Sequence, residues 1–285
     1  MLLRFLGTLC ISLVLLLVFA TWLFPVQALE QRLNYEFSQR LPIATTIQGL
    51  SYTFPSGLRV DRITVELPPQ APRSRLVMRD TAVQLAPQAL LANRIDADIQ
   101  LTVLQGRATL QTALEPAWAP QRFQAQGDWQ ELALEELGVP DMLSTVTALN
   151  GSCMLNGTAS GALQDPLAAQ GHGTIQIANG NVAFPLPGRT LRFPDLSGNG
   201  QWHLTKQQWT LTRSTITAKG ARASLSGSLN LKPEIGASPI DFQGQAAVSG
   251  ANPEAYSLLQ STLGQSELGL TLFGTLDAPR YRLES

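Results

Sequence analysis

The chain of 285 residues has little charge, two cysteines and two histidines. So few Cys and His residues nearly exclude a Cys/His metal site or a disulfide framework. Charged residues make up 14% of the chain, below the roughly 25% typical of soluble domains. The formal net charge of −1 argues against nucleic-acid binding, which needs a basic surface. Because 44% of the residues are apolar, the low charge does not indicate disorder.

The most apolar segment is residues 5–24, which carries no charge and is long enough to cross a bilayer core. Arg4 precedes it, which predicts a cytoplasmic N-terminus and places the rest of the chain outside the cytoplasm. The residues expected in the anchor include Phe5, Leu15, Trp22 and Phe24. The last two lie where an interfacial aromatic belt would form.

A cleaved signal sequence is the alternative for residues 1–28, because Val26 and Ala28 fit the small residues of a cleavage site. The apolar run is longer than an ordinary signal-peptide core, which favours a retained anchor. Residues 29–46 follow as an amphipathic linker, in which Leu29, Leu33 and Phe37 recur at helical spacing. This helix either rests on the membrane surface or covers the end of a sheet.

From residue 47 to residue 285 the apolar residues mostly alternate with polar ones, which predicts half-buried strands. The pattern is typical of a mainly β, antiparallel meander with a few short helices. Residues 198–231 predict four consecutive strands. Short helices are expected over residues 87–93, 129–137 and 253–263. The Asn-Gly pairs at 150–151 and 156–157 predict turns.

One face of the predicted sheet is apolar and the other is rich in Thr, Ser and Gln. The apolar candidates are Trp202, Leu204, Trp209, Leu211 and Ile216. An apolar face of this kind must be covered. It either packs as an ordinary core or forms a concave groove that holds acyl chains.

No arrangement of residues predicts catalysis. His172 and His203 lie outside any nucleophile motif. Asp96 and Asp98 share a strand face, where a paired-carboxylate or cation site is possible in principle but a solvated surface is the simpler interpretation. Cys153 is expected to be a small buried side chain. We therefore expect a protein that is not an enzyme and has no catalytic, metal or cofactor-binding residues.

Charge is separated along the C-terminal half. Residues 206–232 carry only basic charged residues, and residues 234–277 carry only acidic ones. The two segments either pair as surface charge or form a polar face that docks on another protein.

Three segments resemble known envelope proteins. GHGTIQIANGNVAFP, which begins at Gly171, and the strands that follow it resemble protein N of bacterial type II secretion systems. The ending LGLTLFGTLDAPRYRL, with Gly274, Leu276 and Pro279, resembles the ends of the same family and of AsmA-like envelope proteins. The segment PQALLANRIDADIQLTVLQGRATL, which begins at Pro87, resembles an AsmA-like unit. The resemblance covers most of the chain, although its motifs are short alternating strands and glycines.

The resemblance implies an elongated, curved AsmA-like β-groove in the periplasm, carried by a single-pass anchor in the bacterial inner membrane. It implies an accessory component of type II protein secretion that docks on other subunits of the machinery. The alternative is a module that binds or transfers phospholipid. The expected partners are thus secretion subunits, the inner membrane and phospholipid, with no nucleic acid.

Overall fold

The computed structural model describes residues 25–40, 44–53, 56–66, 75–137, 146–186, 189–263 and 266–284. These residues form one antiparallel sheet of fourteen strands, in which each strand pairs only with its neighbours in the chain. The strands are β1 Thr45–Thr53, β2 Gly57–Glu66, β3 Arg75–Leu85, β4 Ile95–Val103, β5 Gly106–Glu115, β6 Arg122–Ala133, β7 Ala148–Ala162, β8 Asp165–Leu186, β9 Arg189–Thr205, β10 Gln208–Ala218, β11 Ala221–Asn230, β12 Pro239–Val248, β13 Glu267–Thr275 and β14 Pro279–Glu284. The predicted mainly β meander is confirmed.

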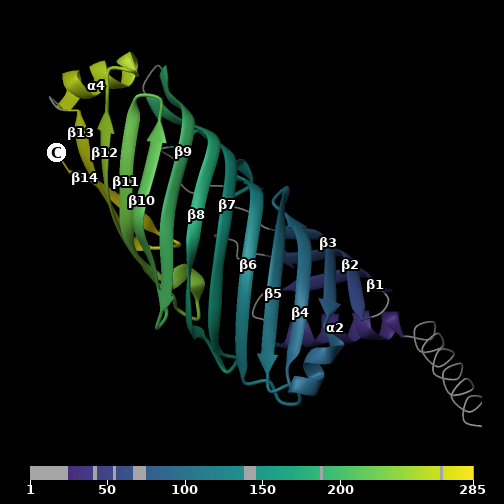
Figure 1. Ribbon diagram of the computed structural model, residues 1–285. Helices are drawn as coiled ribbons and strands as arrows, with labels where there is room; N and C mark the ends of the chain where they lie inside the picture. The colour runs from purple at the N-terminus through teal and green to yellow at the C-terminus, as the bar shows by residue number, and fades with distance from the viewer. Residues whose placement is uncertain are drawn as a thin grey trace, which may run out of the picture.

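The sheet is long, twisted and curved, with β1 and β14 at its two ends (Figure 1). Helical segments are short and lie between strands or before the first one. They are α2 Val26–Arg40, η1 Pro87–Ala92, η2 Leu134–Leu137, η3 Ile235–Ala237 and α4 Pro253–Leu263. The helix predicted over residues 253–263 is confirmed, and residues 87–92 form a single 3-10 segment.

Helix α2 covers the apolar face of the first strands. Its side chains Leu29, Leu33 and Phe37 pack against Ile47 and other buried residues of β1 and β2. Of the two roles expected for the linker helix, the structure shows the one that covers an end of the sheet. The helix begins at Val26, and β1 begins at Thr45, so the last residues of the predicted linker belong to the sheet.

The same helix also closes the free edge of β1. Asn34 donates its side-chain amide to the carbonyl oxygen of Ile47 at 3.0 Å, and its side-chain oxygen accepts the N–H of Ile47 at 2.7 Å. The Glu30 carboxylate accepts the N–H of Leu50 at 3.0 Å. Backbone groups of an edge strand need partners or water. Side chains of α2 therefore take the place of a further strand.

Two local predictions are wrong. The Asn-Gly pairs at 150–151 and 156–157 lie inside β7, where Asn156 pairs with Thr174 and Gly157 pairs with Gly173. Long pairings on both sides of β7 override the turn preference of the dipeptides. The helix predicted from Trp129 is wrong for the same reason, because β6 continues to Ala133 and only the short η2 follows.

The strand count over residues 198–231 also differs from the prediction. Trp209 and Ile216 belong to one strand, β10, whose register shifts between Leu211 and Ser214. Arg213 has a φ of 48° at this β-bulge. Because a bulge adds one residue, it reverses which positions face the core. Ile216 therefore lies on the same face as Trp209 despite the odd spacing between them.

The expected membrane anchor, with Phe5, Leu15, Trp22 and Phe24, lies outside the described residues. Among the helices that the structure describes, none combines the length and the apolar character needed to cross a bilayer.

Candidate functional site

The five apolar candidates lie on one face of the sheet. In the register of β9 and β10, Trp202 is opposite Leu211, and Leu204 is opposite Trp209. Ile216 is opposite Gly198, two positions before Gly200 and four before Trp202. Directly opposed residues of antiparallel strands project from the same face. The structure thus brings together all the residues that the alternation predicted.

This apolar face continues across the whole sheet. Toward the C-terminus, Leu229 is opposite both Trp209 and Ile240, and Phe242 is opposite Leu272. Toward the N-terminus the face includes apolar residues of β8, β7, β6, β5 and β4, here Ile175, Leu155, Trp129, Ala108 and Leu101. One continuous apolar surface therefore runs along the molecule.

The covering of this surface is uneven. Over β1 and β2 it is covered by α2. Near β4–β8, side chains of neighbouring strands pack together around Val103, Leu132 and Cys153, with Leu134 of η2. No helix of the described residues packs broadly on β10–β14. At that end Leu270 and Tyr281 are 36% and 55% exposed. The apolar face is therefore a packed core over β1–β8 and is only partly exposed over β10–β14, where Leu211 and Ile240 are still buried.

A row of glycines crosses the middle of the apolar face. Gly127, Gly157 and Gly173 are opposed in turn on β6, β7 and β8, and Trp202 is opposite the last of them. A Cβ atom added at Gly157 would lie 2.3 Å from Cζ2 of Trp202, and one at Gly173 would lie 2.7 Å from Cε2 of the same ring. The indole of Trp202 therefore lies flat against two neighbouring strands.

Trp129 covers Gly127 in the same way, because a Cβ atom there would lie 2.4 Å from its ring. The indole Nε1 of Trp202 is buried and has no hydrogen-bond partner. Such glycine–tryptophan pairs set how closely the two rings approach the sheet. Sequence reasoning missed this feature. The signal that could have found it is the alignment of glycines across predicted neighbouring strands.

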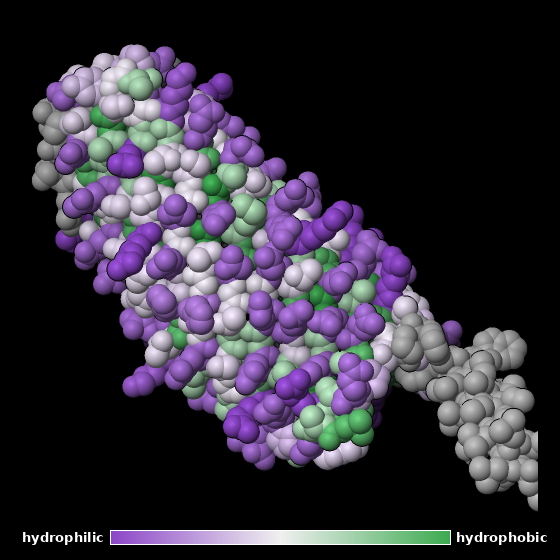
Figure 2. All heavy atoms as spheres, viewed as in Figure 1, coloured by the Kyte–Doolittle hydropathy of each residue, from purple (hydrophilic) through white to green (hydrophobic). Residues whose placement is uncertain are grey.

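The opposite face is polar and hollowed. An open groove of about 780 Å³ is lined by side chains of β4–β9, among them Asp98, Gln126, Thr158, His172 and His203. The two histidines are directly opposed on β8 and β9, and Nδ1 of His172 is 3.4 Å from Oγ1 of Thr158. Figure 2 shows a face of the molecule on which hydrophilic side chains predominate.

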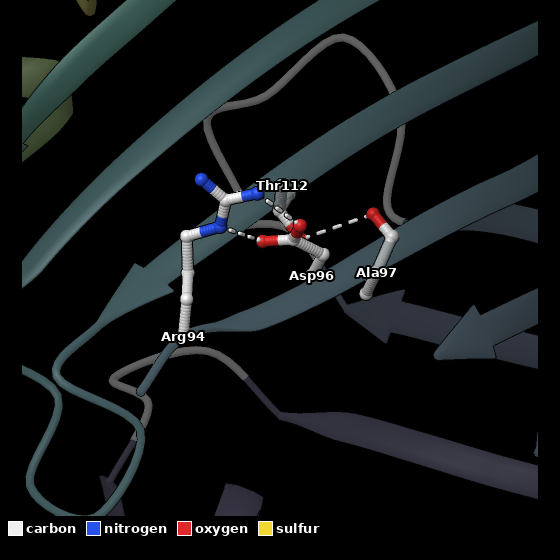
Figure 3. Close-up of polar contacts among 4 residues, drawn as sticks. All are labelled: Arg94, Asp96, Ala97 and Thr112. Carbon is white, nitrogen blue, oxygen red and sulfur yellow. Dashed lines mark hydrogen bonds and ion pairs between the residues drawn. The ribbon is translucent and has the colours of Figure 1, made fainter. Parts of the chain in front are cut away.

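The two aspartates of β4 do not form a paired-carboxylate site. Asp96 accepts two hydrogen bonds of 2.6 Å from the Arg94 guanidinium, as Figure 3 shows. The hydrogen bonding to Asp96 and the negative charge of that carboxylate raise the pKa of Arg94. In the same view, Thr112 donates to the carbonyl oxygen of Ala97 at 3.3 Å. Asp98 is exposed in the polar groove.

The described part of the chain shows neither a reactive cysteine nor a metal site. Cys153 is buried in the core, and burial raises the pKa of its thiol, which disfavours the nucleophilic thiolate. Among the described residues, no three His, Cys, Asp or Glu side chains gather as metal ligands.

The separated charges of the C-terminal half do not pair with each other. No ion pair between described residues joins the basic residues of 206–232 to the acidic residues of 234–277. These side chains are therefore available to solvent or to a partner. The geometry of the described residues offers a partly exposed apolar surface, a hollowed polar surface and a sheet edge at β14 with no paired strand. No protein-family model, no curated protein and no solved structure matches this chain.

Proposed function

We propose that the chain is a cell-envelope module whose open apolar face binds the acyl chains of phospholipid. The observation that carries this proposal is the continuous apolar face, which no helix of the described residues covers over β10–β14. A surface of this kind in water is costly unless something apolar covers it. Each methylene group that it shields contributes about 0.8 kcal/mol.

The chemistry of the apolar face supports acyl chains as the ligand. Half-buried side chains such as Leu204, Trp209 and Phe242 line the face, and hydrocarbon needs no hydrogen-bond partners from them. The phospholipid headgroup would remain in water at the rim of the sheet. In this proposal the packed part near Val103 and Leu132 bounds the apolar face at one end, and lipid reaches the face at the end formed by β10–β14.

Lipid extraction from the purified full chain tests this proposal. Mass spectrometry should find phospholipid that is lost several-fold in the variant Ile216→Gln, because a polar amide on the apolar face repels hydrocarbon. Thr217→Gln on the polar face is the matched control, and it should keep its lipid. A preparation that carries no phospholipid, or equal amounts in both variants, would contradict the proposal.

The expected location is the bacterial inner membrane, with residues 1–28 as a single-pass anchor and the sheet in the periplasm. This part of the proposal rests on the uncharged run of residues 5–24 and the arginine before it. Reporter fusions after residue 46 test the orientation. If a reporter that works only in the cytoplasm is active in this fusion, the orientation is the opposite of the one proposed.

A second candidate function is docking in the type II secretion machinery, as the resemblance to protein N implies. One specific observation favours docking. The edge of β1 is occupied by side chains of α2, whereas β14 pairs only with β13 within the described residues. An extended segment of another subunit can add to such a free edge.

Site-specific photo-cross-linking in native membranes tests the docking function. A cross-linker at Arg282 of β14 should capture a secretion subunit, and one at Thr109, which is exposed on the polar face of β5, should not. Equal capture at both positions, or none at Arg282, would count against docking at this edge.

A further inference from the structure

Exposed apolar side chains gather at one end of the strands. Leu91 is 93% exposed and Trp118 is 84% exposed, and Leu90 is exposed beside them. Leu163, in the turn between β7 and β8, is also exposed. All four belong to connections at the same end of the sheet, because alternate connections of an antiparallel meander lie at the same end. We name these residues the apolar tip.

The apolar tip stands on a backbone held by hydrogen bonds. The N–H of Ala117, next to Trp118, donates to the backbone and side-chain oxygens of Asn93 at the end of η1, at 2.8 and 3.1 Å. The N–H of Leu163 donates to the carbonyl oxygen of Gln121 at 2.8 Å. These bonds link the β3–β4, β5–β6 and β7–β8 connections, which are neighbours at this end of the sheet. The exposure of the apolar tip therefore belongs to a defined structure.

Prolines restrict the loop that carries Trp118. The segment Glu115-Pro116-Ala117-Trp118-Ala119-Pro120 places a proline two residues before and two residues after the indole. Pro87 also begins η1, where its fixed φ suits a helical first turn. Large apolar side chains on such restricted backbones cannot fold back easily onto the sheet. Figure 2 shows hydrophobic side chains that stand out over η1.

The charges next to the apolar tip are mostly neutralised within the protein. Arg94, which follows η1, is paired with Asp96 at 2.6 Å. Arg122 and Glu115, on either side of the Trp118 loop, are 3.9 Å apart. Asp165 is the nearest remaining carboxylate in sequence, and it lies at the start of β8 beyond the Leu163 turn. The tip itself thus presents Leu and Trp without a charged side chain between them.

We infer that the apolar tip inserts into the interfacial layer of a phospholipid membrane. Trp is the side chain most favoured at that depth, and leucines enter the adjoining hydrocarbon. A protein partner would fit a concave or polar-rimmed patch better than separate side chains on protruding connections. The uncharged run of residues 5–24, which is proposed to enter the bilayer, directly precedes α2 in the sequence. The sheet would therefore lie close to that bilayer.

This inference rests on the membrane location proposed above, but not on the binding of acyl chains by the apolar face. Insertion of the tip would orient the sheet relative to the bilayer, because it adds a second contact to the anchor. A single anchor leaves the domain free to rotate. Two contacts hold the end of the sheet that carries η1 against the lipid.

Depth-dependent quenching in vesicles tests this inference. The full chain, with Cys10→Ser and Cys153→Ala, receives a single environment-sensitive dye at Leu91→Cys. It is reconstituted into vesicles of phosphatidylethanolamine and phosphatidylglycerol that contain a lipid with a nitroxide near its headgroup. The side chain of Leu91 is almost fully exposed, so this substitution should leave the fold intact. The control label is at Ser249→Cys, an exposed position at the other end of the strands.

We expect the nitroxide lipid to remove at least about half of the fluorescence at position 91 and almost none at position 249. Adding Trp118→Glu should restore most of the fluorescence at position 91, because a carboxylate resists transfer into the interface. Equal quenching at the two positions would overturn the inference, as would dye shielding without nitroxide quenching, which would indicate a protein contact. A chain that fails to float with the vesicles would overturn both the tip contact and the proposed anchor, whereas flotation without quenching would overturn the tip alone.

Discussion

At the scale of single residues, glycines determine how closely an aromatic ring can approach the sheet. Gly157 and Gly173 leave room for the indole of Trp202, and their neighbours across the sheet are fixed by backbone pairing. The ring can lie flat only where two adjacent strands both lack a Cβ atom. The shape of the apolar face at this point is therefore set by the absence of side chains as much as by the tryptophan.

The variant Gly157→Ala tests this control. Its Cβ atom would lie 2.3 Å from the Trp202 ring and 2.7 Å from the carbonyl oxygen of His172, so the ring must move. Overpacking of this kind lowers the free energy of unfolding by about 1–3 kcal/mol. Urea unfolding followed by tryptophan fluorescence measures the change. Gly250→Ala, where nothing lies within 4 Å of the new Cβ, should have a much smaller effect, and equal effects would contradict the role of the indole contact.

The candidate site could be predicted in part from the residues. Alternation placed Trp202, Leu204, Trp209 and Leu211 on one face, because a period of two is a local property of strands. It did not predict the contact of Trp202 with glycines of β7 and β8, which depends on register between strands. It also missed the apolar tip, because single leucines and tryptophans in short connections resemble ordinary loop residues until their exposure is known.

At the scale of elements, α2 has two roles that its sequence shows only in part. Its four-residue spacing of apolar side chains predicted the packing on β1 and β2. The hydrogen bonds of Asn34 and Glu30 to the edge of β1 were not predictable, because polar positions on an amphipathic helix normally face water. The bulge at Arg213 was missed as well, since the strand continues past it without a turn residue.

Removing the side-chain amide of Asn34 tests the closing of this edge. In Asn34→Ala the backbone N–H and carbonyl oxygen of Ile47 lose their partners, which should cost about 1–3 kcal/mol in the free energy of unfolding. The uncovered edge should also increase self-association. Thermal unfolding and light scattering measure the two effects. Gln39→Ala, on an exposed position of the same helix, serves as the control, and a similar loss there would show that the effect is one of helix propensity.

At the scale of the whole molecule, the sheet is a linear series of neighbours. Each strand pairs only with the strands before and after it in the chain, so the fold class followed directly from local alternation. The curvature did not, because it arises from twist and bulges summed over fourteen strands. The difference between the two ends of the sheet did not follow from alternation either, since it depends on where α2 and η2 pack.

This arrangement predicts a gradient of local stability along the sheet. Among the described residues β14 has a partner on one side only and is six residues long, whereas β8 has 22 residues and is paired on both sides. Amide hydrogen exchange should therefore be fastest in β14, slower in β12 and β13, and slowest in β7–β9. Peptide-level mass spectrometry measures it. Uniform protection from β1 to β14 would show instead that the sheet opens as one cooperative unit.

Pairing limited to chain neighbours also determines how such a protein can change in evolution. Because every described strand pairs only with its neighbours in the chain, duplication or loss of a hairpin inside the series leaves every other pairing in place. Each added hairpin would lengthen the sheet by about 10 Å at ordinary strand spacing. The length of the sheet can then change to match the distance that the molecule has to span. The two end strands, β1 with its contacts to α2 and β14 with its outer edge, stay as they are.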